Sequence, residues 1–271
     1  MASLNRTKDP GYALEASVVI PSYNGAGKIP RLLDALARQT ERNFEVVVVL
    51  DGSTDNTEEV VKRYREKFLR MELITQANGG RAVARNSGAH AANTDLLIFY
   101  DDDMEPFPNS VEKHISFHRH HAGIMCGHPL EVPGVNKTDI QNYKAWLSEK
   151  WTGKYADGIT VMDRDDLFFT ASNCSIPRAI FDRLDGFNDK LKDAEDYELA
   201  YRALDQHIAV YYDKGNKAFH TELITCKGYV GRLREYGKAH KEIASMHQRT
   251  GTASKGAGSF TRSIVYRLFA F

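Results

Sequence analysis

The sequence predicts an α/β fold in which helices cover both faces of a central, mostly parallel sheet. Two observations support this prediction: short apolar runs alternate with amphipathic stretches, and the runs are continuously apolar instead of alternating with polar residues. Strands of that kind are typical of sheets that are buried on both faces. With 271 residues and 42% hydrophobic content, the chain is long enough to bury such a core in one large domain.

The first hundred residues show four strands in succession, separated by three helices. The expected strands are 17–20, 44–50, 71–75 and 96–100, and the expected helices are 28–39, a segment from Ser53 or Asp55 to Phe68, and 81–92. Ligands of such sheets bind beyond the carboxyl ends of the strands. Three polar clusters fall there and form the candidate site: residues 21–24, 51–53 and 101–103.

The acidic run at 101–103 is the most informative of these clusters. Three carboxylates at the mouth of a buried strand repel one another and lose hydration, so a divalent cation would stabilise them. An acidic turn without a metal is the alternative, because Asp is common in turns. The choice between a metal site and an acidic turn depends on the other motifs of the chain.

Charge and cysteine content narrow the class of protein. Lys plus Arg equal Asp plus Glu at 36 each, which argues against a nucleic acid partner. From Cys226 to Phe271, nine Lys or Arg stand against two Glu, a surplus of seven, so the metal site is expected in the first 225 residues. Three widely spaced cysteines and a polar N-terminal segment predict a cytoplasmic protein.

Nucleotide-loop motifs are incomplete in this chain. Gly25, Gly27 and Lys28 look like half of a phosphate loop, but Ser22 stands where a Walker motif needs Gly, and Ile29 stands where it needs Ser or Thr. A dinucleotide fingerprint would need Gly at position 30, which is Pro30. The chain therefore matches neither the Walker motif nor the dinucleotide fingerprint.

Five motifs occur in order along the chain. They are SVVIPSYN at 17–24, VLDGSTDNT at 49–57, ARNSG at 84–88, YDDD at 100–103 and AEDYELAYR at 194–202. Together they resemble the signature of the family 2 glycosyltransferases of the GT-A fold, over roughly residues 16–222. The resemblance implies a Rossmann-like nucleotide-diphospho-sugar transferase fold with a mixed central sheet and helices on both faces.

The resemblance also implies a division of the chain and an activity. We expect a GT-A domain at 1–225, with a nucleotide-binding half at about 16–103 and an acceptor-binding half at about 104–225, followed by a basic helical tail at 226–271. Family members transfer a sugar from a nucleotide-sugar donor, usually UDP-linked, with inversion, to a carbohydrate or lipid-linked acceptor. A GDP- or dTDP-sugar donor is the alternative, and so is a catalytically silent nucleotide-sugar binding protein.

On the donor side, Pro21 and Tyr23 follow the first strand, where the ring can stack on a base. Asp51 resembles the family residue that accepts the N3–H of uracil, although many relatives have two acidic residues there; a helix cap is its alternative role. Arg81 and Arg85 lie four apart near a helix N-terminus and are expected to hold the diphosphate, or else to pair with a carboxylate.

The acidic run resembles the D-x-D metal motif. Asp103 is expected to bind Mn²⁺ or Mg²⁺ directly, and Asp101 to face the ribose or a metal-bound water. Asp102 is placed with the donor-binding residues, with its side chain pointing away from the cation. His220 resembles a histidine that many GT-A enzymes add as a metal ligand, and a structural histidine is the alternative.

Catalysis is expected at the start of a later helix. Asp196 resembles the general base, and Glu195 is expected to orient the acceptor or Asp196. Acidic residues in a first helical turn also complement the helix dipole, which is the alternative for both.

Two further segments carry weaker predictions. His114, His118 and His121 share a helical spacing that we interpret as a surface face. Trp146, Trp151 and Tyr155 are expected to pack, with sugar stacking as the alternative. Residues 259–271 form a short basic amphipathic stretch that predicts peripheral contact with a membrane at its cytoplasmic face. A terminal helix that docks on the catalytic domain is the alternative.

Overall fold

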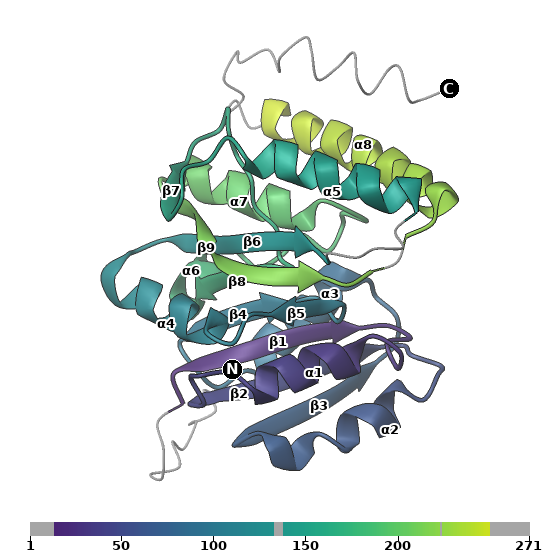
Figure 1. Cartoon of the computed structure of the whole chain (residues 1–271). Helices are drawn as coiled ribbons and strands as arrows, with labels where there is room; N and C mark the ends of the chain where they lie inside the picture. The colour runs from purple at the N-terminus through teal and green to yellow at the C-terminus, as the bar shows by residue number, and fades with distance from the viewer. Residues whose placement is uncertain (1–13, 133–137, 223, 250–271) are drawn as a thin grey trace.

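A computed structural model describes residues 14–132, 138–222 and 224–249 of the chain (Figure 1). The strands are β1 (Ala16–Ser22), β2 (Phe44–Asp51), β3 (Arg70–Gln76), β4 (Leu96–Tyr100), β5 (Met104–Pro106), β6 (Ile124–Glu131), β7 (Ile159–Met162), β8 (Asn173–Pro177) and β9 (Val210–His220). The helices are α1 (Ile29–Ala37), α2 (Thr57–Lys62), the 3₁₀ turn η1 (Arg65–Lys67), α3 (Arg81–Ala91), α4 (Ser110–His120), α5 (Asp139–Thr152), α6 (Arg178–Arg183), α7 (Glu195–Asp205) and α8 (Cys226–Arg249).

The nine strands form one mixed sheet. Its order is β3-β2-β1-β4-β8-β6-β9-β5, and β7 pairs with β9. The strands β3, β2, β1 and β4 are parallel, whereas β8 is antiparallel to β4 and thereby reverses the direction of the sheet. Helices lie on both faces of this sheet (Figure 1), so the predicted fold class is confirmed.

The two faces of β1 show why its sequence is continuously apolar. Val18 and Ile20 belong to a core cluster with Leu32 and Leu36 of α1, while Val19 belongs to a second cluster on the other face with residues of α3. Because successive strand residues point to opposite faces, a sheet covered by helices on both sides needs apolar residues at every position.

α3 lies unusually close to the sheet. A Cβ atom added at Gly88 would come within 2.4 Å of Val19 Cγ1 and 3.0 Å of Val49 Cγ2. The glycine of the ARNSG motif therefore permits close packing of α3 on β1 and β2. That packing buries the side chain of Arg85, which is only 1% exposed.

Two details differ from the sequence predictions. The helix expected to continue to Phe68 ends at Lys62, and the 3₁₀ turn η1 follows it. Its N-terminal side is fixed by Asp55, which lies outside α2 and accepts a hydrogen bond from the backbone N–H of Thr57 at 3.1 Å.

The predicted histidine surface face is wrong for His114. This side chain is fully buried, with its two ring nitrogens 2.9 Å from Ser175 Oγ and 2.9 Å from Asn173 Oδ1. His118 also contacts Ser175 Oγ, at 2.8 Å. Helical spacing did not reveal this, because the polar partners come from β8, about sixty residues away.

The helix predicted after residue 225 is present as α8, and it packs on the rest of the molecule. Ala239 and Ile243 form a small core cluster with Leu191 and Ala194, which immediately precede α7. At its other end, Tyr229 contacts Tyr143 of α5 with the ring centroids 6.3 Å apart. In Figure 1, α8 and α5 accordingly run side by side over α7.

The segment 259–271, for which we predicted membrane contact, lies outside the described residues. Within the described part of the chain, no helix is both long enough and apolar enough to cross a membrane.

Candidate functional site

The three aspartates after β4 have three different partners. Asp101 Oδ1 lies 2.5 Å from Arg85 Nη2, Asp102 Oδ1 lies 2.9 Å from Lys28 Nζ, and Asp103 Oδ2 lies 3.5 Å from His220 Nε2. Residues 101–103, here called the acidic loop, thus direct their carboxylates toward three different partners. This reduces the repulsion among the carboxylates that the sequence implies.

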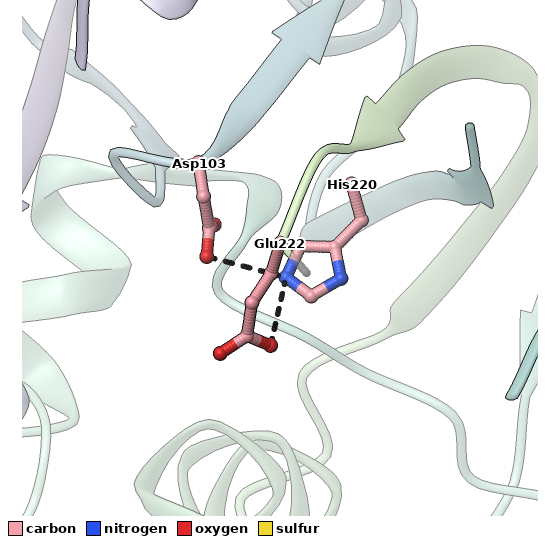
Figure 2. A group of neighbouring side chains, drawn as sticks. All are labelled: Asp103, His220 and Glu222. Atoms are coloured by element: carbon pink, nitrogen blue, oxygen red, sulfur yellow. Dashed lines mark ion pairs between the residues drawn. The ribbon is translucent and has the colours of Figure 1, made fainter. Parts of the chain in front are cut away.

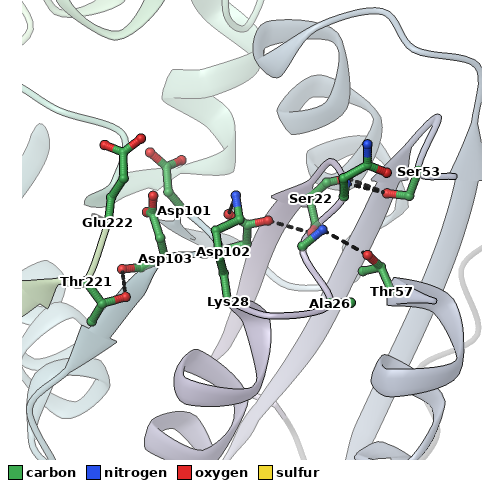
Figure 3. Close-up of polar contacts among 12 residues, drawn as sticks. Ser22, Ala26, Lys28, Ser53, Thr57, Asp101, Asp102, Asp103, Thr221 and Glu222 are labelled. Atoms are coloured by element: carbon green, nitrogen blue, oxygen red, sulfur yellow. Dashed lines mark hydrogen bonds and ion pairs between the residues drawn. The ribbon is translucent and has the colours of Figure 1, made fainter. Parts of the chain in front are cut away.

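Asp102 points toward the α1 side of the site (Figure 3). Besides its ion pair with Lys28, its Oδ2 accepts a 2.6 Å hydrogen bond from Ser22 Oγ at the end of β1. A Cβ at Gly25 would clash with both atoms of that hydrogen bond, at 2.2 and 2.5 Å. Gly25 and Lys28, which resemble half of a phosphate loop, therefore anchor the acidic loop to β1.

Asp103, His220 and Glu222 form a cluster that could hold a metal ion (Figure 2). One ligand atom from each lies within 4.8 Å of the others. The backbone oxygen of Asp103 accepts hydrogen bonds from Thr221 N at 2.8 Å and Thr221 Oγ1 at 2.7 Å (Figure 3). These bonds fasten the acidic loop to the end of β9, where His220 is the last strand residue and Glu222 lies just beyond it.

The charges around this cluster shift the pKa values of Asp103 and His220 in opposite directions. Although burial alone would raise the pKa of Asp103, the hydrogen bond and charge of His220 and the charges of Lys28 and Arg232 lower it to about 2. Burial disfavours protonated His220, but hydrogen bonds with Asp103 and Glu131 outweigh burial and raise the pKa of His220 to about 9. Asp103 is therefore a carboxylate at neutral pH, as a metal ligand must be.

The donor atoms fit a divalent cation. Within the described residues, Asp103 Oδ1 is buried and has no hydrogen-bond partner, so one carboxylate oxygen remains for a ligand. Two carboxylates and an imidazole nitrogen match the preferences of Mn²⁺, and Mg²⁺ accepts the carboxylates. Asp101 was expected to contribute as well, but the ligand-spaced group contains Glu222 instead.

Behind His220, Lys144 and Glu131 surround its second ring nitrogen. Lys144 Nζ lies 2.8 Å from Nδ1, and Glu131 Oε1 lies 3.7 Å from it. Lys144 also pairs with Glu131 at 3.2 Å. An ammonium can only donate, so Nδ1 accepts from Lys144, and Glu131 in turn holds Lys144 in place.

At the other end of the sheet edge, Asp51 ties β2 to the start of α3. It accepts 2.8 Å hydrogen bonds from the backbone N–H groups of Gly79 and Gly80 and from Gln76 Nε2. A carboxylate has about four lone-pair positions, so one remains for a ligand donor. Tyr23 is 52% exposed just after β1, whereas Pro21 lies within β1 opposite Val49.

Arg85 is held by two carboxylates. Its Nη1 lies 2.5 Å from Glu195 Oε1 and its Nη2 lies 2.5 Å from Asp101 Oδ1. Burial would lower the pKa of Arg85, but the charges of Asp101 and Glu195 raise it above its ordinary value, so the guanidinium stays charged. One buried arginine thus connects the acidic loop to the first residue of α7. Arg81 pairs with Asp193 at 3.1 Å and is more exposed.

Asn86 strengthens the same connection. Its side chain donates to Phe187 O at 2.8 Å and accepts from Phe187 N at 2.9 Å, so α3 is bonded to the segment leading into α7. The ARNSG motif therefore links α3 to the segment that leads into α7, a role that its sequence did not reveal.

Asp196 stands next to this ion pair. Its Oδ2 accepts from Ala171 N at 3.0 Å and its Oδ1 from Tyr197 N at 2.8 Å. Burial and the neighbouring charge of Glu195 raise the pKa of Asp196 to about 6, against the opposing effects of Arg85 and the two backbone N–H groups. A carboxylate with a pKa near 6 is well suited to accept a proton at neutral pH.

The aromatic residues of α5 divide into two sets. Tyr155, just beyond the helix, is buried, but Trp146 and Trp151 are 52% and 45% exposed, so the packing predicted for these two tryptophans is wrong. The sugar-stacking alternative stays open for them.

Sequence reasoning missed five polar residues near the site: Glu222, Glu131, Lys144, Arg232 and Asn86. Glu222 had a usable signal, since it lies two residues after His220 beyond a strand. The others carry no local signal, because their partners are distant in the sequence.

Comparison with known proteins places these residues in context. Residues 17–185 match the family described as Glycosyl transferase family 2. Validoxylamine A glucosyltransferase of Streptomyces hygroscopicus subsp. jinggangensis is 34% identical over 213 residues, which cover 69% of this chain and 50% of that protein. Glycosyltransferase GlyA of Streptococcus pneumoniae serotype 4 is 38% identical over 150 residues, covering 54% of this chain and 21% of that protein. The chain thus spans half or less of these curated relatives.

Solved structures agree with the fold. Mannosyltransferase PcManGT from Pyrobaculum calidifontis, in complex with GDP-Man and Mn²⁺, superposes with a TM-score of 0.67 at 20% identity, covering 95% of this chain and 71% of that one. S. aureus TarS 1-349 in complex with UDP-GlcNAc gives 0.63 at 23% identity, covering 78% and 59%. Both are GT-A transferases, so the predicted GT-A fold is confirmed.

Proposed function

Since the chain belongs to Glycosyl transferase family 2, we propose that it is a metal-dependent inverting glycosyltransferase. In this proposal it moves a sugar from a nucleotide-sugar donor, UDP-linked, to a carbohydrate or lipid-linked acceptor. GDP-Man in one structural relative and UDP-GlcNAc in another keep a GDP- or dTDP-sugar donor as the alternative.

One observation carries the proposal. Arg85 joins Asp101, two residues from the candidate metal ligand Asp103, to Glu195, the neighbour of Asp196. The ion pairs of Arg85 thereby link the candidate metal ligand, which would stabilise a leaving diphosphate, to Asp196, which would accept a proton. A catalytically silent binding protein would need the first group but not the second.

The donor is expected along the carboxyl ends of β1, β2 and β4. Tyr23 would stack on the base, and the remaining lone pair of Asp51 would accept the N3–H of uracil. Pro21, near the end of β1, would set the direction in which the chain leaves the strand toward Tyr23. Asp101 and Asp102 would support the acidic loop, since their oxygens already bind Arg85, Lys28 and Ser22.

Asp103, His220 and Glu222 would hold the Mn²⁺ or Mg²⁺ ion. When bound, the cation supplies positive charge that stabilises the departing nucleoside diphosphate. Asp103 Oδ1 offers the free buried oxygen for this purpose, and Lys144, held by Glu131, would orient the His220 ring.

Asp196 is proposed as the general base. Its carboxylate takes the proton of the acceptor hydroxyl while the hydroxyl oxygen bonds to the anomeric carbon and the bond from that carbon to the phosphate oxygen breaks. Glu195 would position Asp196 through its ion pair with Arg85, which neutralises one of two adjacent carboxylates. Inversion follows from a single displacement on the face opposite the leaving group.

A donor screen tests this proposal. The purified chain is incubated with UDP-, GDP- and dTDP-sugars and simple carbohydrate acceptors, and nucleoside diphosphate release is measured with and without added Mn²⁺. We expect release from a UDP-sugar that requires the metal. Equal release in excess chelator would contradict the metal dependence.

Membrane contact is a separate proposal for the segment 259–271, which the structure does not describe. We expect salt-sensitive binding to anionic liposomes that is lost when these residues are deleted. Equal sedimentation of the intact and shortened proteins would contradict it.

A further inference from the structure

We propose that Arg232 of α8 binds the diphosphate of the donor. In the absence of a divalent cation, Arg232 forms an ion pair with Glu222, and a cation that binds this carboxylate releases it. This inference rests on the proposed function, because it needs a nucleoside diphosphate ligand. It assigns the diphosphate to a residue of α8 in place of Arg81 and Arg85, for which the sequence predicted this role.

The arginines of α3 are already neutralised. Both terminal nitrogens of Arg85 are bonded to carboxylates, and its side chain is buried. Arg81 lies 3.1 Å from Asp193 and 3.9 Å from Glu195. Two arginines thus face three carboxylates, Asp101, Asp193 and Glu195, so this region has no positive charge to spare for a phosphate.

The lysines near the site are committed in the same way. Lys28 pairs with Asp102 at 2.9 Å. Lys144 lies 3.2 Å from Glu131 and 2.8 Å from His220 Nδ1, on the side of the ring away from Asp103, and is only 14% exposed. Moving Lys28 to a ligand would take the counter-ion from buried Asp102, which is costly. Moving Lys144 would take the cation from Glu131, whose side chain is only 16% exposed.

Arg232 differs from these residues in its partner. Its side chain is about as exposed as those of Lys28 and Arg81, and its Nη1 lies 2.8 Å from Glu222 Oε2. The Glu222 side chain, however, is 30% exposed, against 8% for Asp102 and 15% for Asp193, so water can solvate it when Arg232 leaves. A guanidinium has five N–H donors in a planar fork that suits phosphate oxygens. Its charge also acts on Asp103, where it contributes to the lowered pKa of that carboxyl group. Arg232 therefore stands at the open side of the candidate metal cluster with donors to offer.

α8 has a firm base from which to present this side chain. Ala239 and Ile243, two and three turns beyond Arg232, pack against Leu191 and Ala194. Ala194 has a left-handed backbone with φ of 58°, a costly conformation for alanine, and its side chain is buried in this contact. The same helix thus contacts the metal cluster and the residue before Glu195.

The ion pair with Glu222 makes metal and diphosphate binding interdependent. A cation held by Asp103, His220 and Glu222 supplies the positive charge that Arg232 supplies to Glu222 in the free protein. Arg232 is then available to the phosphates. Metal and nucleotide would each strengthen the binding of the other through this residue, in addition to any direct contact between them.

Calorimetric titration of the full chain tests the diphosphate assignment. UDP, GDP and dTDP are titrated with saturating Mn²⁺, and uridine serves as the ligand without phosphates. We expect Arg232→Gln to weaken diphosphate binding by roughly tenfold to a hundredfold and to leave uridine binding unchanged. The matched control is Arg234→Gln, an exposed arginine on the same helix, which should stay within about twofold of wild type.

The outcomes separate the two proposals. Equal affinities of Arg232→Gln and Arg234→Gln for the diphosphate that wild type binds would overturn this inference and leave the proposed function intact. If wild type binds none of the three diphosphates with Mn²⁺, both fail.

Glu222→Gln tests the competition. Without metal, this variant should bind UDP several-fold more tightly than wild type, because Arg232 is released and a negative charge is removed. The gain should disappear in Arg232→Gln/Glu222→Gln, and Mn²⁺ affinity measured by electron paramagnetic resonance should fall in both. Metal-free UDP binding of Glu222→Gln that is unchanged or weaker would overturn the competition between metal and arginine.

Discussion

Asp103 and Asp196 are carboxylates of one candidate site, yet their surroundings move their pKa values in opposite directions. Both are disfavoured as anions by burial, but Asp103 faces His220, Lys28 and Arg232, and its pKa falls to about 2. Asp196 has an anionic neighbour in Glu195, whose partner Arg85 is shared with Asp101, and its pKa rises to about 6. The neighbours of a carboxylate therefore decide whether it can hold a cation or take a proton.

The largest effect is expected from Asp196→Asn. Because a general base contributes about 10²- to 10⁴-fold, turnover should fall by roughly 10³-fold while UDP affinity stays within a few-fold of wild type. Steady-state rates of nucleoside diphosphate release and calorimetric titration with UDP and Mn²⁺ measure the two quantities. A large loss of UDP affinity would instead assign Asp196 to donor binding or folding.

Asp103→Asn should have the next largest effect. It removes the free oxygen Oδ1 from the metal cluster, so turnover should fall by about 10²-fold and Mn²⁺ affinity should fall with it. Asp102→Asn is the comparison, since both oxygens of Asp102 are already bonded to Ser22 and Lys28. Equal losses of Mn²⁺ affinity in the two variants would contradict the assignment of Asp103 as the ligand.

The rate should depend on pH through Asp196. A base must be ionised to act, so turnover should be constant above about pH 7 and should fall about tenfold per pH unit below about pH 6. Glu195→Gln removes the adjacent negative charge, so the same profile should move toward lower pH. A pH profile of that variant that coincides with wild type would contradict the influence of Glu195 on Asp196.

The smallest effects are expected on stability, and they should differ in sign. Because the pKa of Asp196 is raised above 3.8, the free energy of unfolding decreases as pH rises from 3.8 to about 6, and the full cost applies at pH 7. Asp196→Asn should therefore raise the melting temperature by a few degrees.

Asp103 provides the opposite case. Its lowered pKa contributes stability above pH 3.8, which is lost as pH falls toward about 2. Asp103→Asn should lower the melting temperature of the metal-free protein at pH 7. Differential scanning calorimetry in the presence of chelator measures the melting temperatures of both variants. Changes of the same sign in the two variants would contradict the contrast between Asp103 and Asp196.

The sequence by itself determined the fold class and the positions of the main site residues. Continuous apolar runs located β1, β2 and β4, because a sheet covered on both faces requires them. β3, at the edge of the sheet, has a shorter and less buried apolar run. The polar residues after these strands then had to lie at one edge of the sheet, since parallel strands end together. Asp51, Asp101 and Asp103 could be found in this way.

Only the tertiary structure decided which charges are paired. Arg85 meets Glu195 across 110 positions of sequence, and Arg232 meets Glu222 from a helix that composition indicated only as basic. The sequence showed Arg85 near a helix N-terminus, but the close packing at Gly88 buries it between two carboxylates. Pairing and burial depend on residues that are distant in the chain, and these two factors set the charge state of each group.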